Sequence, residues 1–426
     1  MIKLNHKYHI PHIVWHMMVF FFIIFGLISI VNHYLLRTYA LDLGVYTNAL
    51  YDYSHFQFND SSTFKEVPEN LLADHFDLYL IILAPLSLIF KTYTLLIVQI
   101  LAVLAGGLGV FRYFQSTSSL KIATYATLYF FLFFGIYSAL SFDYHSNVIA
   151  TMIIPWFLLY LKKENSKAAV ICFVFILIGK ENLSLWMFFI SIGLLFEYRH
   201  NNRIKKLLIF LCVFSLGYFI VITEYIMPSF SNTGSYPHFN YATLGNSSFE
   251  AIQFLISHPF QSIELFFTNH LGNSNYDFIK LELFMLLILS GLPILFFKPY
   301  YLIMLLPVFA QKLFHDNPSM WGIQNQYSVE FAPILAIGIF VIIGQLKNSN
   351  LRKWLTILLP LLALASTIRL MDSTVVYTDK NKLRIYKAAH YQRNYSLINL
   401  THKLSEIPKD AIVSAQSPFL AQLAYR

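Results

Sequence analysis

Long apolar runs separated by short polar segments make up most of the chain. A helix crosses a hydrocarbon core of about 30 Å with roughly 20 residues, or fewer where it is tilted or shielded by protein. The runs that lack Asp, Glu, Lys and Arg cover residues 92–111, 122–142, 146–161, 168–179, 182–196, 207–223, 283–297, 299–311, 331–346 and 354–368. This pattern predicts an all-α polytopic membrane protein.

Two other apolar stretches need separate interpretation. The first runs from Ile13 to about Leu36, which is longer than a signal-peptide core, and no small-x-small cleavage site follows it. We therefore expect a retained first span. The second stretch, residues 78–90, is short and contains Pro85.

Basic residues near the ends of the runs indicate the orientation, because cytoplasmic loops carry an excess of Lys and Arg. Lys3 and Lys7 predict a cytoplasmic N-terminus. Segment 37–77 holds two basic residues against seven acidic ones, so we expect it outside. The basic clusters that we expect inside are Arg112 with Lys121, Lys162 with Lys163 and Lys167, Arg199 to Lys206, and Lys347 with Arg352 and Lys353.

The number of crossings between these clusters follows from parity. Only an odd number fits between the outer segment that ends near residue 77 and the inner Arg112, so 78–90 is expected to be an embedded helix that does not cross. Segment 168–198 has inner flanks on both sides, so the chain crosses twice there, with Lys180-Glu181-Asn182 as the outer turn. The prediction is about 11 transmembrane helices plus embedded outer helices in residues 1–370. Residues 371–426 are expected to form an extracytoplasmic C-terminal region, the start of a small α/β unit.

Composition supports this picture and excludes other classes of protein. Hydrophobic residues make up 57% of the 426 and charged residues 12%, whereas soluble domains carry about 25% charged residues. The net charge of +8 lies in the clusters between apolar runs, so it indicates topology and not nucleic-acid binding. Cys172 and Cys212 both lie in apolar segments and suggest neither a disulfide framework nor a metal site.

Asp42 is the first candidate for chemistry, because it follows the first span directly and precedes a probable amphipathic stretch that begins at Tyr46. A carboxylate there could act as a general base, or it could simply cap a helix. The second candidate is Asp74-His75-Phe76-Asp77, just before the embedded helix. These residues could bind a divalent cation, or the loop could only cap the next helix.

Two further outer turns each hold one acidic and one basic residue. Asp143 and His145 lie between two spans, where a turn needs polar residues but not this pair. Lys180 and Glu181 could form a structural ion pair, or Lys180 could neutralise a phosphate while Glu181 binds metal. The outer-loop residues that could contact a substrate, or serve only as loop residues, are His238, His270, His315 with Asp316, and Gln324-Asn325-Gln326-Tyr327.

These motifs, in this order, resemble a family of bacterial and archaeal membrane proteins known as domain of unknown function 2079. The resemblance runs from about residue 15 to the end of the chain. It rests on residues 41–46 (Leu-Asp-Leu-Gly-Val-Tyr), Asp74-His75-Phe76 with Ala84-Pro85-Leu86, Phe142-Asp143-Tyr144-His145, Gly179-Lys180-Glu181-Asn182 and the tail 407–416. Asn182 and Ser146 depart from the usual Asp and Pro of that family, and its C-terminal region usually continues beyond the position of Arg426.

The family in turn looks like a distant member of the C-type glycosyltransferase superfamily, whose enzymes take a sugar from a polyprenyl phosphate. This resemblance implies that Asp42 is the catalytic carboxylate and Asp143 the second acidic position. It further implies transfer to a cell-envelope glycan or lipid on the outer side of the cytoplasmic membrane. The residues expected to contact substrate or phosphate are Lys180, His145, Tyr46 and Asn325, and those expected to hold a divalent metal ion are His75 and Glu181.

Two other functions remain open at this point. A transporter or lipid flippase would place charged residues near the bilayer midplane, often within inverted repeats, whereas here they collect on one side. A non-catalytic assembly protein of the envelope would need no site at all. No nucleotide-binding glycine loop is present in the sequence, which fits a donor that is already activated.

Overall fold

A computed structural model describes residues 10–408 and 410–426, and these residues form helices and turns without a β-strand. The all-α prediction is confirmed. Lys3 and Lys7, which support the predicted cytoplasmic N-terminus, and Lys409 lie outside the described residues. The strand expected after residue 371 is not found: the region holds α19 (Leu397–Ser405), α20 (Ser417–Leu423) and short 3₁₀ turns. A strand there would have no neighbour to pair with, and an isolated strand is not stable.

Fewer helices than predicted are long enough to cross a membrane. Among the residues that the structure describes, four qualify by length and composition: α1 (His12–Tyr34), α3 with α4 (Tyr79–Thr117), α11 with α12 (Asn202–Phe230) and α18 (Ser349–Asp372). A fifth arises if α5 (Leu120–Leu132) and α6 (Phe134–Leu140), bent by 44°, count as one span. The count of eleven is therefore not supported. Composition alone overcounts because several apolar runs are broken, as at Phe133, where ψ is 128°.

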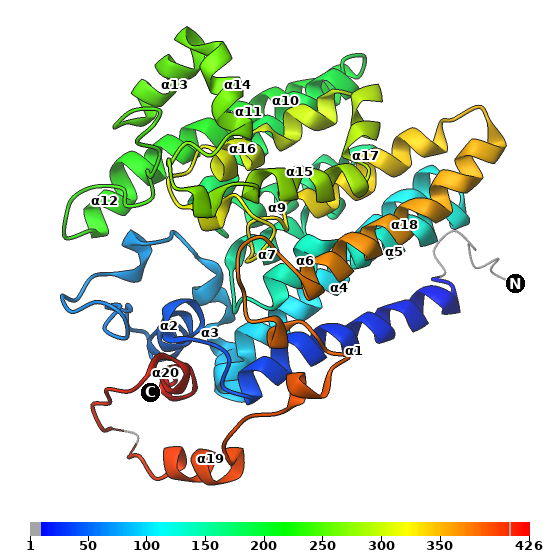
Figure 1. The fold of residues 1–426 in the computed structure, drawn as a ribbon. Helices are drawn as coiled ribbons and strands as arrows, with labels where there is room; N and C mark the ends of the chain where they lie inside the picture. Colours follow the sequence, from blue (N-terminus) through cyan, green and yellow to red (C-terminus); the bar gives the residue numbers. More distant parts are fainter. Residues whose placement is uncertain (1–9, 409) are drawn as a thin grey trace, which may run out of the picture.

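The remaining apolar runs form shorter helices. They are α7 with α8 (Ser146–Thr151 and Ile154–Lys162), α9 (Ser166–Leu177), α10 (Glu181–Glu197), α15 (Ile279–Leu289), α16 (Tyr300–Leu313) and α17 (Phe331–Gly344). Two further short helices, α13 (Ser248–Ser257) and α14 (Pro259–Phe267), project from one edge of the molecule (Figure 1).

The stretch 78–90, predicted to be an embedded helix that does not cross, forms a helix with a backbone break before α4, although the two helices together are long enough to count as one candidate span. α3 (Tyr79–Phe90) ends at Lys91, whose φ of 48° and ψ of −126° are not helical, and a 3₁₀ turn leads from there into α4 (Thr94–Thr117). α3 packs against α2 (Val45–Ser54). The two helices share a small apolar cluster that includes Leu50, Leu80 and Ala84.

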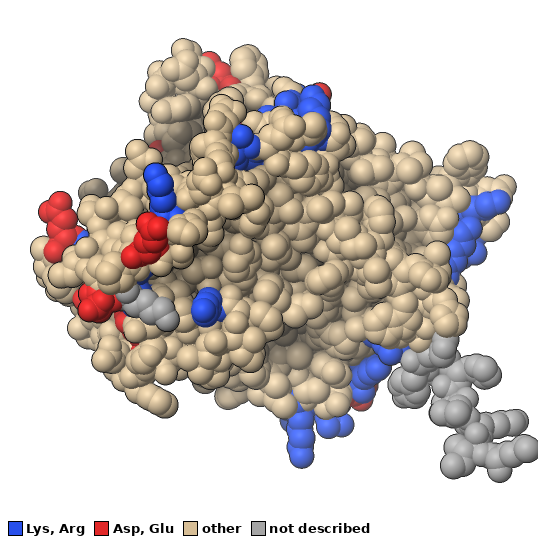
Figure 2. All heavy atoms as spheres, turned by 90° about the horizontal axis from the view of Figure 1, so that it is seen from below, with Lys and Arg blue, Asp and Glu red and all other residues tan. Residues whose placement is uncertain are grey.

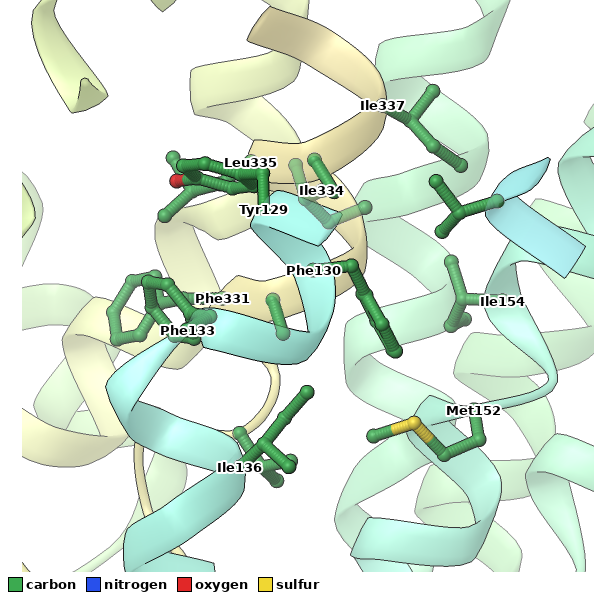
Figure 3. Packing of buried hydrophobic residues seen from close by; sticks show 14 of the residues in the cluster. Tyr129, Phe130, Phe133, Ile136, Met152, Ile154, Phe331, Ile334, Leu335 and Ile337 are labelled. Carbon is green, nitrogen blue, oxygen red and sulfur yellow. The ribbon is translucent and has the colours of Figure 1, made fainter. Parts of the chain in front are cut away.

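The main core surrounds α17, where nearly every side chain is buried. Side chains of α5, α6, α8 and α17 meet there, as Figure 3 shows. The residues labelled in that view are Tyr129, Phe130, Phe133, Ile136, Met152, Ile154, Phe331, Ile334, Leu335 and Ile337. By contrast, α1 and α11 (Asn202–Val221) expose most of their apolar side chains, as helices that face lipid would.

The two ends of the helical body differ in chemistry. The described N-terminal end lies on one side and the C-terminus on the other, beside α2 and α3 (Figure 1). In Figure 2 most red acidic side chains gather at the left end, and a broad tan surface separates them from blue basic side chains near the N-terminal end. The candidate site residues lie in linkers and helix starts around α2, α3 and α10.

Candidate active site

Asp42 lies in the short linker between α1 and α2. Its backbone has φ 72° and ψ −95°, which L-residues rarely adopt. α2 begins at Val45 with Gly44 as its N-cap and has no side-chain cap hydrogen bond, so Asp42 does not cap this helix. Strained backbone of this kind costs about 1–3 kcal/mol and clusters at functional sites. The local geometry thus favours the functional interpretation of Asp42.

The C-terminal helix α20 holds this linker in place. It packs against residues 40–44, and the backbone N–H of Ala40 donates to Oγ of Ser417 at 2.8 Å. Nδ2 of Asn48 on α2 donates to the backbone carbonyl of Arg426 at 3.2 Å. Segments far apart in the sequence therefore fix the position of Asp42 together.

The Asp42 carboxylate faces His145, with 3.4 Å between Oδ1 and Nε2. His145 is buried, and its ring stacks on that of Phe142. Burial alone would raise the pKa of Asp42, but the charge and hydrogen bonding of His145 outweigh it, and the charges of His75 and Lys180 add to the effect. The pKa of Asp42 therefore lies below its usual value. With 23% of its side chain exposed, the ionised carboxylate can accept a proton from a bound hydroxyl.

Asp143 is buried behind this pair. Its Oδ2 accepts a hydrogen bond from the backbone N–H of Tyr39 at 2.9 Å, three residues before Asp42. Burial raises the pKa of Asp143 to about 7, although the charge of Lys382 acts in the opposite direction. Asp143 thus contacts the backbone of the linker, and it lies near enough to Asp42 for the negative charge of Asp42 to add to the rise in its pKa.

Gln99 of α4 fixes the turn that carries Asp143 and His145. Its Nε2 donates to the backbone carbonyl of Asp143, and its Oε1 accepts from the backbone N–H of His145, both at 3.0 Å. The side chain of Gln99 is itself buried. The turn between α6 and α7 is therefore anchored to α4 by two hydrogen bonds.

Glu181, the first residue of α10, is the centre of a second cluster and is only 1% exposed. Its Oε1 lies 3.1 Å from Nδ1 of His75, and its Oε2 accepts from the backbone N–H of Phe76 at 3.1 Å. The hydroxyl of Tyr236 also donates to Oε1, at 3.4 Å. Of the two alternatives for Lys180 and Glu181, the structural ion pair between them is not found, and Glu181 pairs with His75.

His238 completes this cluster from the loop between α12 (Met227–Phe230) and α13. Its ring stacks on that of His75, with 4.1 Å between centroids, and its Nε2 lies 3.4 Å from Oδ1 of Asp74. Burial would raise the pKa of Asp74, but the charges of His75 and His238 reverse this and lower it below its usual range. Burial also lowers the pKa of His75. One ligand atom from each of Asp74, His75 and His238 lies within 4.8 Å of the others.

Lys180 lies between the two clusters at the start of α10. Its positive charge lowers the pKa of both Asp42 and Asp74. It also lines a small polar cavity, together with Asn147, Asn182, Val308, Gln311, Lys312, Met320, Gln326, Tyr327 and Glu330. The ammonium group of Lys180 can pair with an anionic group at this cavity, and its charge must outweigh the repulsion from the ionised carboxylate of Asp42.

Two predicted substrate contacts make no hydrogen bond to the clusters, although burial raises the pKa of the Tyr46 hydroxyl and Tyr46 lies close enough to Asp42, Asp74 and Glu181 for their negative charges to raise it further. Tyr46 is buried in the apolar cluster around α2 and α3, where its ring packs edge-on against Tyr144 at 5.5 Å. Asn325 lies in the loop before α17 with a φ of 61°. Among the described residues, neither side chain hydrogen-bonds to the carboxylate or histidine groups above.

The other outer-loop candidates stabilise loops elsewhere. Nδ1 of His270 lies 3.1 Å from Nζ of Lys280, and its ring packs on Trp321. Oδ2 of Asp316 accepts from the backbone N–H of Ala242 at 2.8 Å, and Nδ1 of His315 accepts from that of Asn317. Of the four outer-loop candidates, His238 joins the Glu181 cluster, and Gln326 and Tyr327 of a second candidate line the cavity beside Lys180.

Sequence reasoning did not identify Gln99, Tyr236 or Lys382. Gln99 could have been found in the sequence, because it is a polar amide in the middle of an apolar run. A search for charged residues does not include amides. Tyr236 is one of 28 tyrosines and has no distinguishing neighbour in the sequence. Lys382 lies in the C-terminal region, where Nζ stands 4.5 Å from the centre of the Tyr39 ring.

Comparison with known proteins now adds the family. A family model described as "Predicted membrane protein (DUF2079)" matches residues 32–426, so the chain belongs to this family. No curated protein and no solved structure matches the chain.

Proposed function

We propose that this member of the DUF2079 family is a membrane glycosyltransferase. It would move a sugar from a polyprenyl-phosphate donor to an acceptor of the cell envelope, on the extracytoplasmic side of the cytoplasmic membrane. The observation that carries the proposal is Asp42: a partly exposed carboxylate with a lowered pKa, on strained backbone, paired with a buried histidine. In this proposal the N-terminus is cytoplasmic and the C-terminus extracytoplasmic.

The chemical step needs a base and a site for the leaving phosphate. Asp42 takes the proton of an acceptor hydroxyl as the acceptor oxygen forms its bond to the anomeric carbon of the donor. The bond from that carbon to the phosphate oxygen breaks through an oxocarbenium-like state, and the lipid phosphate leaves with the electron pair. Attack opposite to the leaving group inverts the anomeric centre.

Lys180 is the group best placed to meet the leaving phosphate. Its charge acts on Asp42, and it faces the polar cavity beside α16 and the loop before α17. A positive charge that is already in place where negative charge develops stabilises the transition state, and the protein does not need to rearrange during the reaction. The lipid tail would lie along the apolar surface of the spans.

His145 and Asp143 would act through Asp42 and not on the sugar. His145 keeps Asp42 ionised and oriented, since Nε2 faces Oδ1 at 3.4 Å. Asp143 holds the backbone of Tyr39 and with it the linker. In this scheme Asp143 positions Asp42.

The test is transfer by purified protein in lipid nanodiscs supplied with polyprenyl-phosphate sugars. Asp42→Asn should abolish transfer and donor hydrolysis, while the matched variant Asp60→Asn, an exposed carboxylate in the same outer segment, should keep wild-type turnover. Turnover in Asp42→Asn equal to wild type would refute the role of Asp42. Flux of labelled lipid or sugar across liposomes without any chemistry would instead support a transporter.

A further inference from the structure

The cluster of Asp74, His75 and His238 has the composition of a metal site. We infer that these three residues bind a divalent transition-metal ion of the Zn²⁺ class. The sequence indicated the segment Asp74 to Asp77, and the resemblance His75 with Glu181, whereas in the structure the converging ligand atoms come from Asp74, His75 and His238. The inference stands independently of glycosyl transfer, because it concerns binding and not the reaction.

One distance in the cluster matches that between two ligands of one ion, and the other ligand atoms lie not far beyond it. Two atoms each about 2.1 Å from Zn²⁺ at a tetrahedral angle lie about 3.4 Å apart. Nε2 of His238 and Oδ1 of Asp74 are separated by 3.4 Å. All three ligand atoms lie within 4.8 Å of one another, so a shift of roughly 1 Å in a side chain closes the site around an ion.

The tautomer of His75 is fixed by Glu181. Nδ1 of His75 lies 3.1 Å from Oε1 of the buried Glu181, so this nitrogen carries the proton and Nε2 is left as a lone-pair donor. A carboxylate behind a metal-binding histidine is the usual way in which proteins orient such a ligand. Oε2 of Glu181 is occupied by the backbone N–H of Phe76, which makes Glu181 an orienting group and not a ligand.

In the structure His238 hydrogen-bonds to a backbone carbonyl, and this bond competes with metal binding. Its Nε2 also lies 2.6 Å from the backbone carbonyl of Asp74, and it binds metal only as the tautomer with the proton on Nδ1. A small turn of the ring away from the carbonyl gives this arrangement. The metal would then join the loop before α3 to the loop before α13. These two segments are already linked by the stacked rings of His75 and His238 and by hydrogen bonds from Asn232 to Glu69 and Pro68.

The ligand set selects the kind of ion. Two imidazoles and one carboxylate suit Zn²⁺, Co²⁺ or Mn²⁺, whereas Mg²⁺ and Ca²⁺ prefer oxygen ligands. The side chains of His75, Asp74 and His238 are 17%, 28% and 31% exposed, so an ion can enter from solvent and keep one position open for water.

The experiment uses the full chain in detergent, purified without a polyhistidine tag and treated with EDTA. Calorimetric titration with Zn²⁺ should give one equivalent bound, and Co²⁺ should produce the visible d–d absorption of a tetrahedral site. His238→Ala and Asp74→Asn should each weaken Zn²⁺ binding by at least about 100-fold, and Glu181→Gln by about 10- to 100-fold. Mg²⁺ should not compete.

The matched control is His258→Ala, because His258 is an exposed histidine outside the cluster, and it should bind Zn²⁺ like wild type. Each variant is checked for helical circular dichroism and a monodisperse gel-filtration peak, so that loss of binding is separated from loss of fold. The inference is overturned if folded wild type binds no stoichiometric Zn²⁺, or if folded His238→Ala and Asp74→Asn bind it unchanged. Neither result depends on sugar transfer, so the proposed function can fail or stand separately.

Discussion

Nε2 of His145 lies 3.4 Å from Oδ1 of Asp42, and hydrogen bonds from other residues hold the backbone beside both partners. The backbone of His145 is held by Gln99, and the linker of Asp42 is held through Tyr39 by Asp143. The pair is thus a fixed arrangement with one partly exposed carboxylate. Its main physical effect is on the protonation of Asp42, since His145 is the largest influence that opposes burial.

Substitution of His145 by alanine should move the acid limb of the pH–rate profile upward. Asp42 works as a base only when ionised, and removal of His145 takes away the main influence that opposes burial, so the pKa of Asp42 would rise. Activity would then fall at a higher pH than in wild type as the pH decreases. Measurement of transfer rates between pH 4 and 8 checks this. Phe142→Leu, which removes only the stacked ring, should leave the acid limb in place, and an unchanged limb in His145→Ala would contradict the assignment.

Replacement of Gln99 by methionine should destabilise the protein. The backbone carbonyl of Asp143 and the N–H of His145 would both lose a buried partner, at a cost of roughly 1–3 kcal/mol each. The expected result is a lower Tm in detergent and slower transfer, because the turn would no longer hold His145 against Asp42. Leu101→Met, at an exposed position on the same helix, should change the Tm little. Equal Tm values for the two variants would argue against this role of Gln99.

How far the sequence determines the site is clear from particular residues. The charge pattern grouped Asp42, His75, His145, Lys180 and Glu181 on one side, and the structure brings these side chains near one another. It did not predict which groups pair. Pairing depends on how turns from distant segments meet, and a capping Asp differs from a functional one only in backbone angles that a sequence pattern does not encode.

His238 shows the same limit for loops. In the sequence it is one of several outer histidines, and only the long connection between α12 and α13 brings its ring onto that of His75. The spans illustrate a different limit. An apolar run reports burial in lipid or in protein alike, and α17 is apolar because other helices surround it.

The orientation can be tested by labelling single cysteines in cells. In a background with Cys172→Ala and Cys212→Ala, Ser62→Cys should react with a membrane-impermeant maleimide added outside. Ser349→Cys, at the start of α18, should react only after the membrane is permeabilised. Both serines are exposed, whereas the neighbouring Ser61 is buried and unsuitable. Labelling in the opposite order would reverse the proposed topology.

The buried carboxyl of Asp143 should make the protein less stable as the pH rises from about 4 to about 7. Its pKa is raised to about 7 in the fold, against about 3.9 in an unfolded chain, so the folded state binds the proton more tightly between these values. The contribution of Asp143 to the free energy of unfolding is therefore complete below about pH 4 and is lost as the pH rises to about 7. The loss is at most about 4 kcal/mol, from about 1.4 kcal/mol per pKa unit.

Asp143→Asn should remove this dependence, because an amide does not titrate yet its oxygen can still accept from the N–H of Tyr39. The Tm in detergent should fall less between pH 5 and 7.5 than it does in wild type. Some slope should remain, because burial also raises the pKa of Asp77 to about 7. Asp60→Asn, at an exposed position, should keep the wild-type slope. If Asp143→Asn kept it too, the proton would not be held at Asp143, and the charge of Lys382 would have to dominate over burial.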